Sequence, residues 1–187
     1  NIVSSNPSMV ERFRREGEAL GDLNHPNIVK VLYAGQCEDD HYLIMEFVPG
    51  GSLRDLLDKM PKLVVQRALY IGLDLADALT RAHRLNILHR DIKPGNVLIA
   101  NDGTPRLTDF GVARVGASNM TAEGSLVGTL AYLSPESLTG ADIDERHDIW
   151  AFGVMLFEML AGHRPYQEER IAPLISAITT QPIPDLE

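Results

Sequence analysis

Hydrophobic and polar residues recur at helical spacing over four stretches of this 187-residue chain. Residues 8–22 read as a helix with charges on the face opposite its apolar residues, and residues 168–180 read as one more helix. Residues 61–85 show the same helical spacing over a longer stretch, which predicts a long helix. Residues 145–161 are apolar nearly all round, which predicts a helix surrounded by protein. The apolar face of the 61–85 helix comprises Ala68, Ile71, Leu75, Leu79 and Ala82.

Shorter apolar runs predict strands. Residues 28–33 and 42–47 are separated by a polar segment and read as an antiparallel hairpin. Ser52 and Asp55 have the spacing of a capping box, which opens a short helix. Residues 97–99 and 106–108 flank the turn 101–103, whereas 112–134 is rich in Gly, Ser and Thr and predicts a long functional loop.

Composition narrows the class of protein. Hydrophobic residues make up 44% and charged residues 23%, as in an ordinary globular domain. The net charge of -9 argues against a nucleic-acid partner. The single cysteine, Cys37, suits a reducing, cytoplasmic compartment. The longest apolar stretch, 150–161, is interrupted by Glu158 and is too short to span a membrane, although a membrane anchor in a longer parent protein stays an open alternative.

One run of residues carries chemistry. It reads His89-Arg90-Asp91-Ile92-Lys93-Pro94-Gly95-Asn96, and Asp109-Phe110-Gly111 follows the predicted turn. Asp91 alone could be a loop-capping aspartate. With Asn96 five residues on and Asp109 after a hairpin, the pattern instead supplies one carboxylate for a substrate hydroxyl and two oxygen ligands for magnesium. Phosphoryl transfer needs this division of labour.

With these motifs the chain resembles the eukaryotic-type Ser/Thr protein kinases, especially those of bacteria. Further matching segments lie in family order: 13–16, 25–29, 42–48, 128–129, 134–136, 148–153 and 162–166. The resemblance implies an α+β, two-lobe kinase fold that is incomplete at both ends. Residues 1–48 are expected to be a remnant of the N-terminal lobe, and 49–187 a mainly helical C-terminal lobe.

The resemblance implies roles for the catalytic residues. Asp91 is expected to act as the catalytic base, and Lys93 to place a positive charge on the transferred phosphate. Thr129 is expected to hydrogen-bond both and to shape the acceptor pocket; its alternative is a turn threonine. Asn96 and Asp109 are expected to hold Mg²⁺, with Mn²⁺ as an alternative ion, and ATP to donate the phosphate.

Nucleotide binding is expected to use residues on both sides of the hinge between the two lobes, which belongs to the segment 42–48. Glu16 corresponds to the family's ion-pair glutamate, and Met45 to the gatekeeper. Glu46 and Val48 would offer backbone groups to adenine, and Leu98 would pack beneath the ring or serve as plain core. A stacked spine between the lobes is expected from Leu20, Val31, His89 and Phe110, with Asp148 at its base.

Regulation and partners follow from the same resemblance. Arg90 is expected to bind a phosphorylated residue of the loop after Asp109, with Ser118, Thr121 and Ser125 as candidates. Each candidate could equally be a plain polar loop residue. The expected partners are proteins with Ser or Thr acceptors, together with a second kinase copy for autophosphorylation.

The chain also departs from the family pattern. No lysine precedes Lys30 and no Gly-x-Gly-x-x-Gly loop is present, so this part of the domain is expected to be inactive in isolation. A pseudokinase-like scaffold is the alternative, and a small-molecule kinase such as an aminoglycoside phosphotransferase is less favoured. Ser134 stands in place of the usual alanine, a change expected to be neutral.

Overall fold

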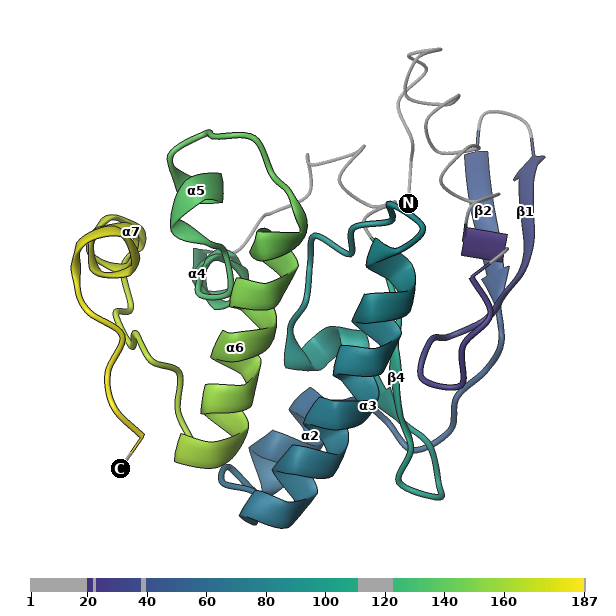
Figure 1. Ribbon diagram of the computed structural model, residues 1–187, viewed down its shortest axis with the longest axis horizontal. Coiled ribbons are helices and arrows are strands. Elements are labelled where there is room, and N and C mark those ends of the chain that lie inside the picture. Colours follow the sequence, from purple (N-terminus) through teal and green to yellow (C-terminus); the bar gives the residue numbers. More distant parts are fainter. Residues whose placement is uncertain (1–19, 22, 38–39, 111–122, 187) are drawn as a thin grey trace.

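The computed structural model describes residues 20, 21, 23–37, 40–110 and 123–186 (Figure 1). A two-stranded sheet lies at one edge, and the rest is a helical body with a second small sheet (Figure 1). This mixture of mainly helices with small sheets fits the expected α+β class. Residues 20 and 21 are helical, and the rest of the predicted helix 8–22 lies outside the described residues.

The first sheet is an antiparallel hairpin, as predicted. Its strands are β1 (Val31–Cys37) and β2 (Asp40–Met45), paired with Gly35 opposite Tyr42. The predicted bounds, 28–33 and 42–47, were wrong because residues 27–29 pair elsewhere. The Leu107 N–H donates to Asn27 O, and the Val29 N–H donates to Leu107 O, both at 2.8 Å. This pairing ties the hairpin to the helical body.

Two helices follow the hinge. The helix α2 (Leu53–Lys59) begins at the predicted capping box: the Asp55 N–H donates to Ser52 Oγ at 3.1 Å, and the Ser52 N–H donates to Asp55 Oδ2 at 2.7 Å. The helix α3 (Val65–His83) is shorter than predicted at both ends. It begins late because the Leu63 N–H donates to Met159 O at 2.8 Å, which holds the preceding segment against another helix. The predicted apolar face of α3 is buried throughout.

The second sheet follows the run of residues 89–96 along the chain. A short 3-10 helix, η1 (Pro94–Asn96), leads into β3 (Val97–Ile99), which pairs antiparallel with β4 (Pro105–Leu107). Gly103 lies in the turn with φ 90°, a left-handed conformation that favours glycine. The predicted strand–turn–strand unit is confirmed.

The segment predicted as one loop over 112–134 contains a helix, so that prediction was wrong. The helix α4 (Glu123–Leu130) lies against α7 (Ile171–Thr180), and the short α5 (Pro135–Leu138) follows it. The composition of α4 is a poor guide because Gly, Ser and Thr are weak helix formers. Val127 is buried in the core, so tertiary packing outweighs local propensity.

The helix α6 (Glu145–Ala161) has the bounds predicted from its apolar pattern. Asp144 caps its start, and Gly162, with φ 86°, ends it. It packs on α3 and runs through the middle of the helical body (Figure 1). Its buried residues include His147 and Asp148 near the start and Glu158 near the end. Among the helices of the described part, none has the length and apolarity that a membrane crossing needs.

Candidate active site

Asp91 lies at the centre of a cluster of side chains from one loop. Its Oδ2 receives the Lys93 ammonium at 2.8 Å and the Asn96 amide Nδ2 at 2.8 Å. The same Nδ2 also donates to the Asp91 carbonyl at 2.8 Å. Both donors are on Oδ2, and within the described residues no donor contacts Oδ1.

His89 fixes the backbone beside Asp91. Its side chain is fully buried, and burial lowers its pKa, so the ring is neutral. The Asp91 N–H points at Nδ1 at 3.3 Å, which makes Nδ1 the acceptor. Nε2 therefore carries the proton and donates to Thr108 O at 3.0 Å. The ring thus connects the catalytic loop to the segment before Asp109.

Asp148 holds the loop from the start of α6. Its carboxylate is inaccessible to solvent and accepts from the His89 N–H and the Arg90 N–H, each at 2.8 Å. The His83 Nε2 from α3 lies 2.8 Å from the same carboxylate. Arg90 has φ 65°, a conformation that costs a non-glycine residue about 1–3 kcal/mol. These hydrogen bonds offset that cost.

The carbonyl of Arg90 is held from another direction. His147 Nε2 lies 3.3 Å from Arg90 O, and His147 Nδ1 lies 3.0 Å from the Ser134 hydroxyl. Ser134 is buried and also caps α5. The serine expected to be a neutral replacement for alanine therefore has hydrogen-bond partners that an alanine would lack. The sequence offered no signal for this link beyond the departure itself.

Asp109 and Asn96 present the oxygen ligands that a magnesium ion prefers. The Asn96 amide nitrogen donates to Asp91, so the amide oxygen of Asn96 is the atom that could bind a cation. Asp109 is exposed and has φ 59°, and the next residue, Phe110, is buried with its ring 4.5 Å from the His89 ring. Phe110 thereby fixes the backbone that carries the Asp109 carboxylate. This oxygen donor set fits Mg²⁺.

The residues expected to form the spine lie in or against the core, and the continuous stack stays a prediction. Leu20 and Phe110 are buried, and Val31 packs against the same core. The His89 ring lies against the Phe110 ring at a tilt of 42°, and Asp148 accepts a hydrogen bond from the His89 backbone N–H.

The residues expected at the nucleotide differ in exposure. Met45 ends β2 and is partly exposed, Val48 is buried, and Leu98 on β3 is half-buried. The Glu46 N–H donates to Lys30 O at 3.0 Å, so it is occupied within the fold. The Glu46 carboxylate also pairs with Arg106 at 2.8 Å. The roles assigned to these residues toward adenine stay predictions.

Some expected residues fall outside the description. Glu16, Ser118 and Thr121 lie outside the described residues. Ser125 lies within α4, and its side chain is not among those described.

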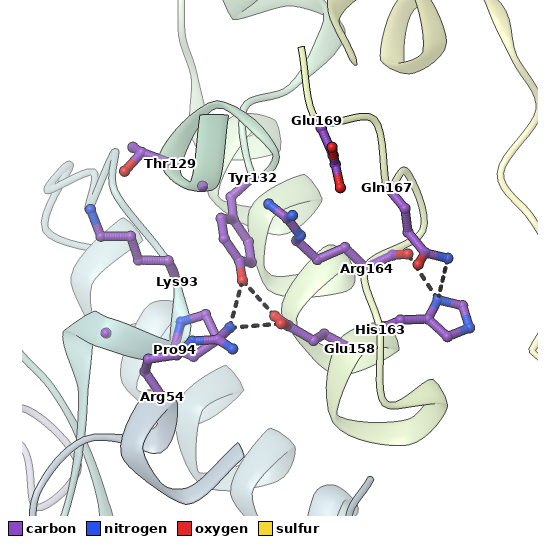
Figure 2. A pocket seen from close by; sticks show the side chains of 12 residues that line it. Arg54, Lys93, Pro94, Thr129, Tyr132, Glu158, His163, Arg164, Gln167 and Glu169 are labelled. Carbon is purple, nitrogen blue, oxygen red and sulfur yellow. Dashed lines mark hydrogen bonds and ion pairs between the residues drawn. The ribbon is translucent and has the colours of Figure 1, made fainter. Parts of the chain in front are cut away.

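A pocket of about 600 Å³ opens beside the catalytic loop (Figure 2). Lys93 and Thr129 both line it. Thr129 makes no hydrogen bond to Asp91 or Lys93 in the described part of the chain, so the expected contacts are absent from this conformation. The reason is that Thr129 sits in α4, and not in the extended loop that was expected.

The floor of the pocket contains a cluster that sequence reasoning missed. The Arg54 guanidinium lies 2.6 Å from Glu158 Oε1 and 3.1 Å from the Tyr132 hydroxyl, which donates to Glu158 Oε2 at 2.5 Å. Burial disfavours the charged form of Arg54, but the hydrogen bond to Glu158, the charges of Tyr132 and Glu158 and the hydrogen bond to Asp58 together raise its pKa. Burial and the Glu158 charge raise the pKa of Tyr132. The one indication of this cluster in the sequence was Glu158, a carboxylate within the apolar stretch 150–161.

Comparison with known proteins agrees with this geometry. The protein kinase domain family matches residues 2–184. The chain is 42% identical over 182 residues to the serine/threonine-protein kinase PknK of Mycobacterium bovis, covering 95% of this chain and 16% of that protein. It is 37% identical over 163 residues to a probable serine/threonine-protein kinase of Clostridium perfringens, CPE1738, covering 87% of this chain and 24% of that protein. For the probable serine/threonine-protein kinase PknB of Lactococcus lactis the identity is 35% over 178 residues, 95% of this chain and 28% of that protein.

The chain therefore belongs to the protein kinase domain family. Its curated relatives of bacterial origin are named as Ser/Thr kinases. The chain spans between 16% and 28% of the length of these three relatives.

Proposed function

We propose that this chain is part of the catalytic domain of an ATP-dependent protein kinase that phosphorylates serine and threonine. The observation that carries the proposal is the Asp91 carboxylate, with Lys93 and Asn96 both on Oδ2. An orienting carboxylate beside a phosphate-binding ammonium is the arrangement that in-line phosphoryl transfer requires.

In this mechanism the acceptor hydroxyl donates to the second oxygen of Asp91, which orients it and takes its proton as the new bond to phosphorus forms. Lys93 stabilises the negative charge on the transferred group. Asn96 and Asp109 would hold Mg²⁺, which when bound neutralises phosphate charge. Met45, Glu46, Val48 and Leu98 would surround the adenine, and Glu16 would supply the family's ion pair.

Arg90 is proposed to couple activity to phosphorylation of Ser118, Thr121 or Ser125. A phosphate carries about -1.5 to -2 charge at neutral pH and pairs strongly with guanidinium. The position of Arg90 supports the proposal, because a residue directly before Asp91 can transmit a change in its own placement to the base.

Further assignments complete the proposal. Mn²⁺ is proposed to substitute for Mg²⁺ because the ligands are hard oxygens. Two copies of the kinase are proposed to meet for autophosphorylation. A cytoplasmic location is proposed on the single cysteine and on ATP as the phosphate donor.

The test uses the full-length parent protein and an Asp91→Asn variant. Phosphate transfer from labelled ATP to a generic basic protein should fall by several orders of magnitude, since base and orientation are lost together. Asp102→Asn, in the exposed turn of the β3–β4 hairpin, is the matched control and should keep wild-type activity. Asp91→Asn activity within tenfold of wild type would overturn the assignment.

The type of acceptor is tested separately. Phosphoamino-acid analysis of the autophosphorylated parent protein should yield phosphoserine and phosphothreonine. Predominant phosphotyrosine would contradict the acceptor class. A wild-type protein that binds nucleotide but transfers no phosphate would support the scaffold alternative.

A further inference from the structure

We propose that the pocket beside the catalytic loop is a substrate subsite for an anionic side chain near the acceptor residue, with Arg54 and Arg164 as the specificity-determining residues. The proposal rests on the proposed kinase function and adds the class of substrate.

The pocket lies close to the proposed acceptor site at Asp91. Lys93 lines it and at the same time contacts Asp91 at 2.8 Å. Thr129 and Tyr132 line the facing side (Figure 2). An extended chain advances about 3.3 Å per residue. A side chain within a few residues of the acceptor hydroxyl therefore reaches the pocket.

The carboxylate at the floor of the pocket is already satisfied. Glu158 has 9% of its side chain exposed, with Arg54 on Oε1 and the Tyr132 hydroxyl on Oε2. A basic substrate residue would have to displace Arg54 to pair with it. Displacement would place two guanidinium groups beside one buried carboxylate and leave Arg54 only its longer 3.4 Å carboxylate contact, with the exposed Asp58, which is costly. The pocket therefore disfavours a basic residue.

Two arginines that line the pocket, Arg54 and Arg164, are accessible to a bound side chain. Arg54 has 38% of its side chain exposed. Arg164 extends toward Tyr132 (Figure 2) and makes no side-chain hydrogen bond or ion pair to any residue in the described part of the chain. Guanidinium groups bind carboxylate and phosphate through paired N–H donors. An aspartate, a glutamate or a phosphorylated residue supplies the matching acceptors.

A second carboxylate of the lining does not reverse this balance. Glu169 is exposed at the rim and forms no ion pair with Arg164 within the described structure. An exposed carboxylate is well solvated and contributes little to binding a cation.

The test uses the full-length protein and synthetic peptides with one serine in an alanine background. Each peptide carries Asp, phosphothreonine, Ala or Arg at one of the three positions before or after the serine. Both kcat/KM and the dissociation constant, from fluorescence anisotropy, are measured. At one position Asp or phosphothreonine should be favoured over Ala by about tenfold, the scale of one hydrogen bond between charged groups. Comparison of these two peptides separates the carboxylate source from the phosphate source.

Substitutions at the two arginines test which of them causes the preference for an anionic residue. Arg164→Gln should remove most of it, whereas Arg81→Gln, an exposed arginine on α3, should retain it. Arg54→Gln frees the Glu158 carboxylate and should reverse the preference, so that Arg is favoured over Asp at the same position. The double variant Arg54→Gln/Glu158→Gln keeps Arg164 and lacks the freed carboxylate, so it should again favour Asp over Arg. This recovery guards against a folding defect as the cause of the reversal in the single variant.

Outcomes for the subsite and for the kinase proposal are distinct. Equal or better use of the Arg peptides at every position by the wild type overturns the subsite while leaving kinase activity in place. Absence of transfer to every peptide, with Asp peptides still bound more tightly than Arg peptides, overturns the proposed activity and supports the subsite. Absence of any anionic preference in binding and in transfer overturns the subsite.

Discussion

Replacing Asp148 by asparagine should disorder the catalytic loop, although the residue lies on a different element from Asp91. The carboxylate accepts from the backbone N–H groups of His89 and Arg90 through separate oxygens, and it is fully buried. Asparagine keeps one oxygen and substitutes an NH₂ donor for the other. One backbone N–H then faces another donor with no water to replace the lost partner.

The magnitude follows from these contacts. A hydrogen bond to a charged group contributes about 1.5–3 kcal/mol, and an unsatisfied buried donor costs about 1–3 kcal/mol. Where the NH₂ group faces Arg90, the contact that offsets its left-handed φ of 65° is lost as well. We expect a loss of about 3 kcal/mol in the free energy of unfolding. For a domain of this size, that corresponds to a fall in Tm of about 6–12 °C.

The activity should fall as well. A displacement of a catalytic group by about 1 Å costs about 100-fold in rate. The assay pairs thermal unfolding of the full-length protein with kcat on a serine peptide. Asp144→Asn is the matched control: it makes the same chemical change at the N-cap of the same helix, where asparagine caps as well as aspartate. Asp148→Asn with a Tm within 2 °C of the control (~1 kcal/mol or less) and unchanged kcat would refute this account of the loop.

Two further predictions concern the neighbours of Asp148. Ser134→Ala should cost about 1–2 kcal/mol in unfolding free energy, because it removes the hydrogen bond to His147 and the cap of α5; Ser176→Ala, exposed on α7, should change it by less than about 0.5 kcal/mol, and equal effects would contradict the assignment. Burial lowers the pKa of His89 below 6.5, so the unfolded chain binds more protons there, and stability should fall as the pH drops below that value, by up to about 1.4 kcal/mol per pH unit. Chemical denaturation between pH 5 and 8, an interval chosen as about 1.5 units either side of the histidine value, should show a shallower dependence for His89→Gln, and identical slopes would exclude His89 as the source.

The sequence predicted those features that local pattern determines. The bounds of α6 could be read because the helix is apolar nearly all round after its polar first turn, with Asp144 before it and Gly162 after it. The catalytic cluster could be read because Asp91, Lys93 and Asn96 lie within one short loop, so their proximity is a matter of spacing.

What could not be predicted depends on contacts between distant segments. Arg54 and Glu158 are 104 positions apart, and nothing in either neighbourhood indicates the other. The strand bounds failed for the same reason, since residues 27–29 pair with β4 and not with β2. The helix α4 went unnoticed because the burial of Val127 outweighs the weak helix propensity of its neighbours.

The two ends of α6 serve two different requirements of the site. Asp148 in its first turn positions the catalytic loop, and Glu158 in its last turn holds Arg54 at the floor of the pocket. Ten residues separate them, about 15 Å along a helix. Because one helix holds both groups, the distance between the catalytic base and the pocket is set by a rigid element. Under the proposed roles, substitutions at Arg54 or Arg164 should therefore change substrate choice without moving Asp91, whereas a substitution at Asp148 should displace Asp91 itself.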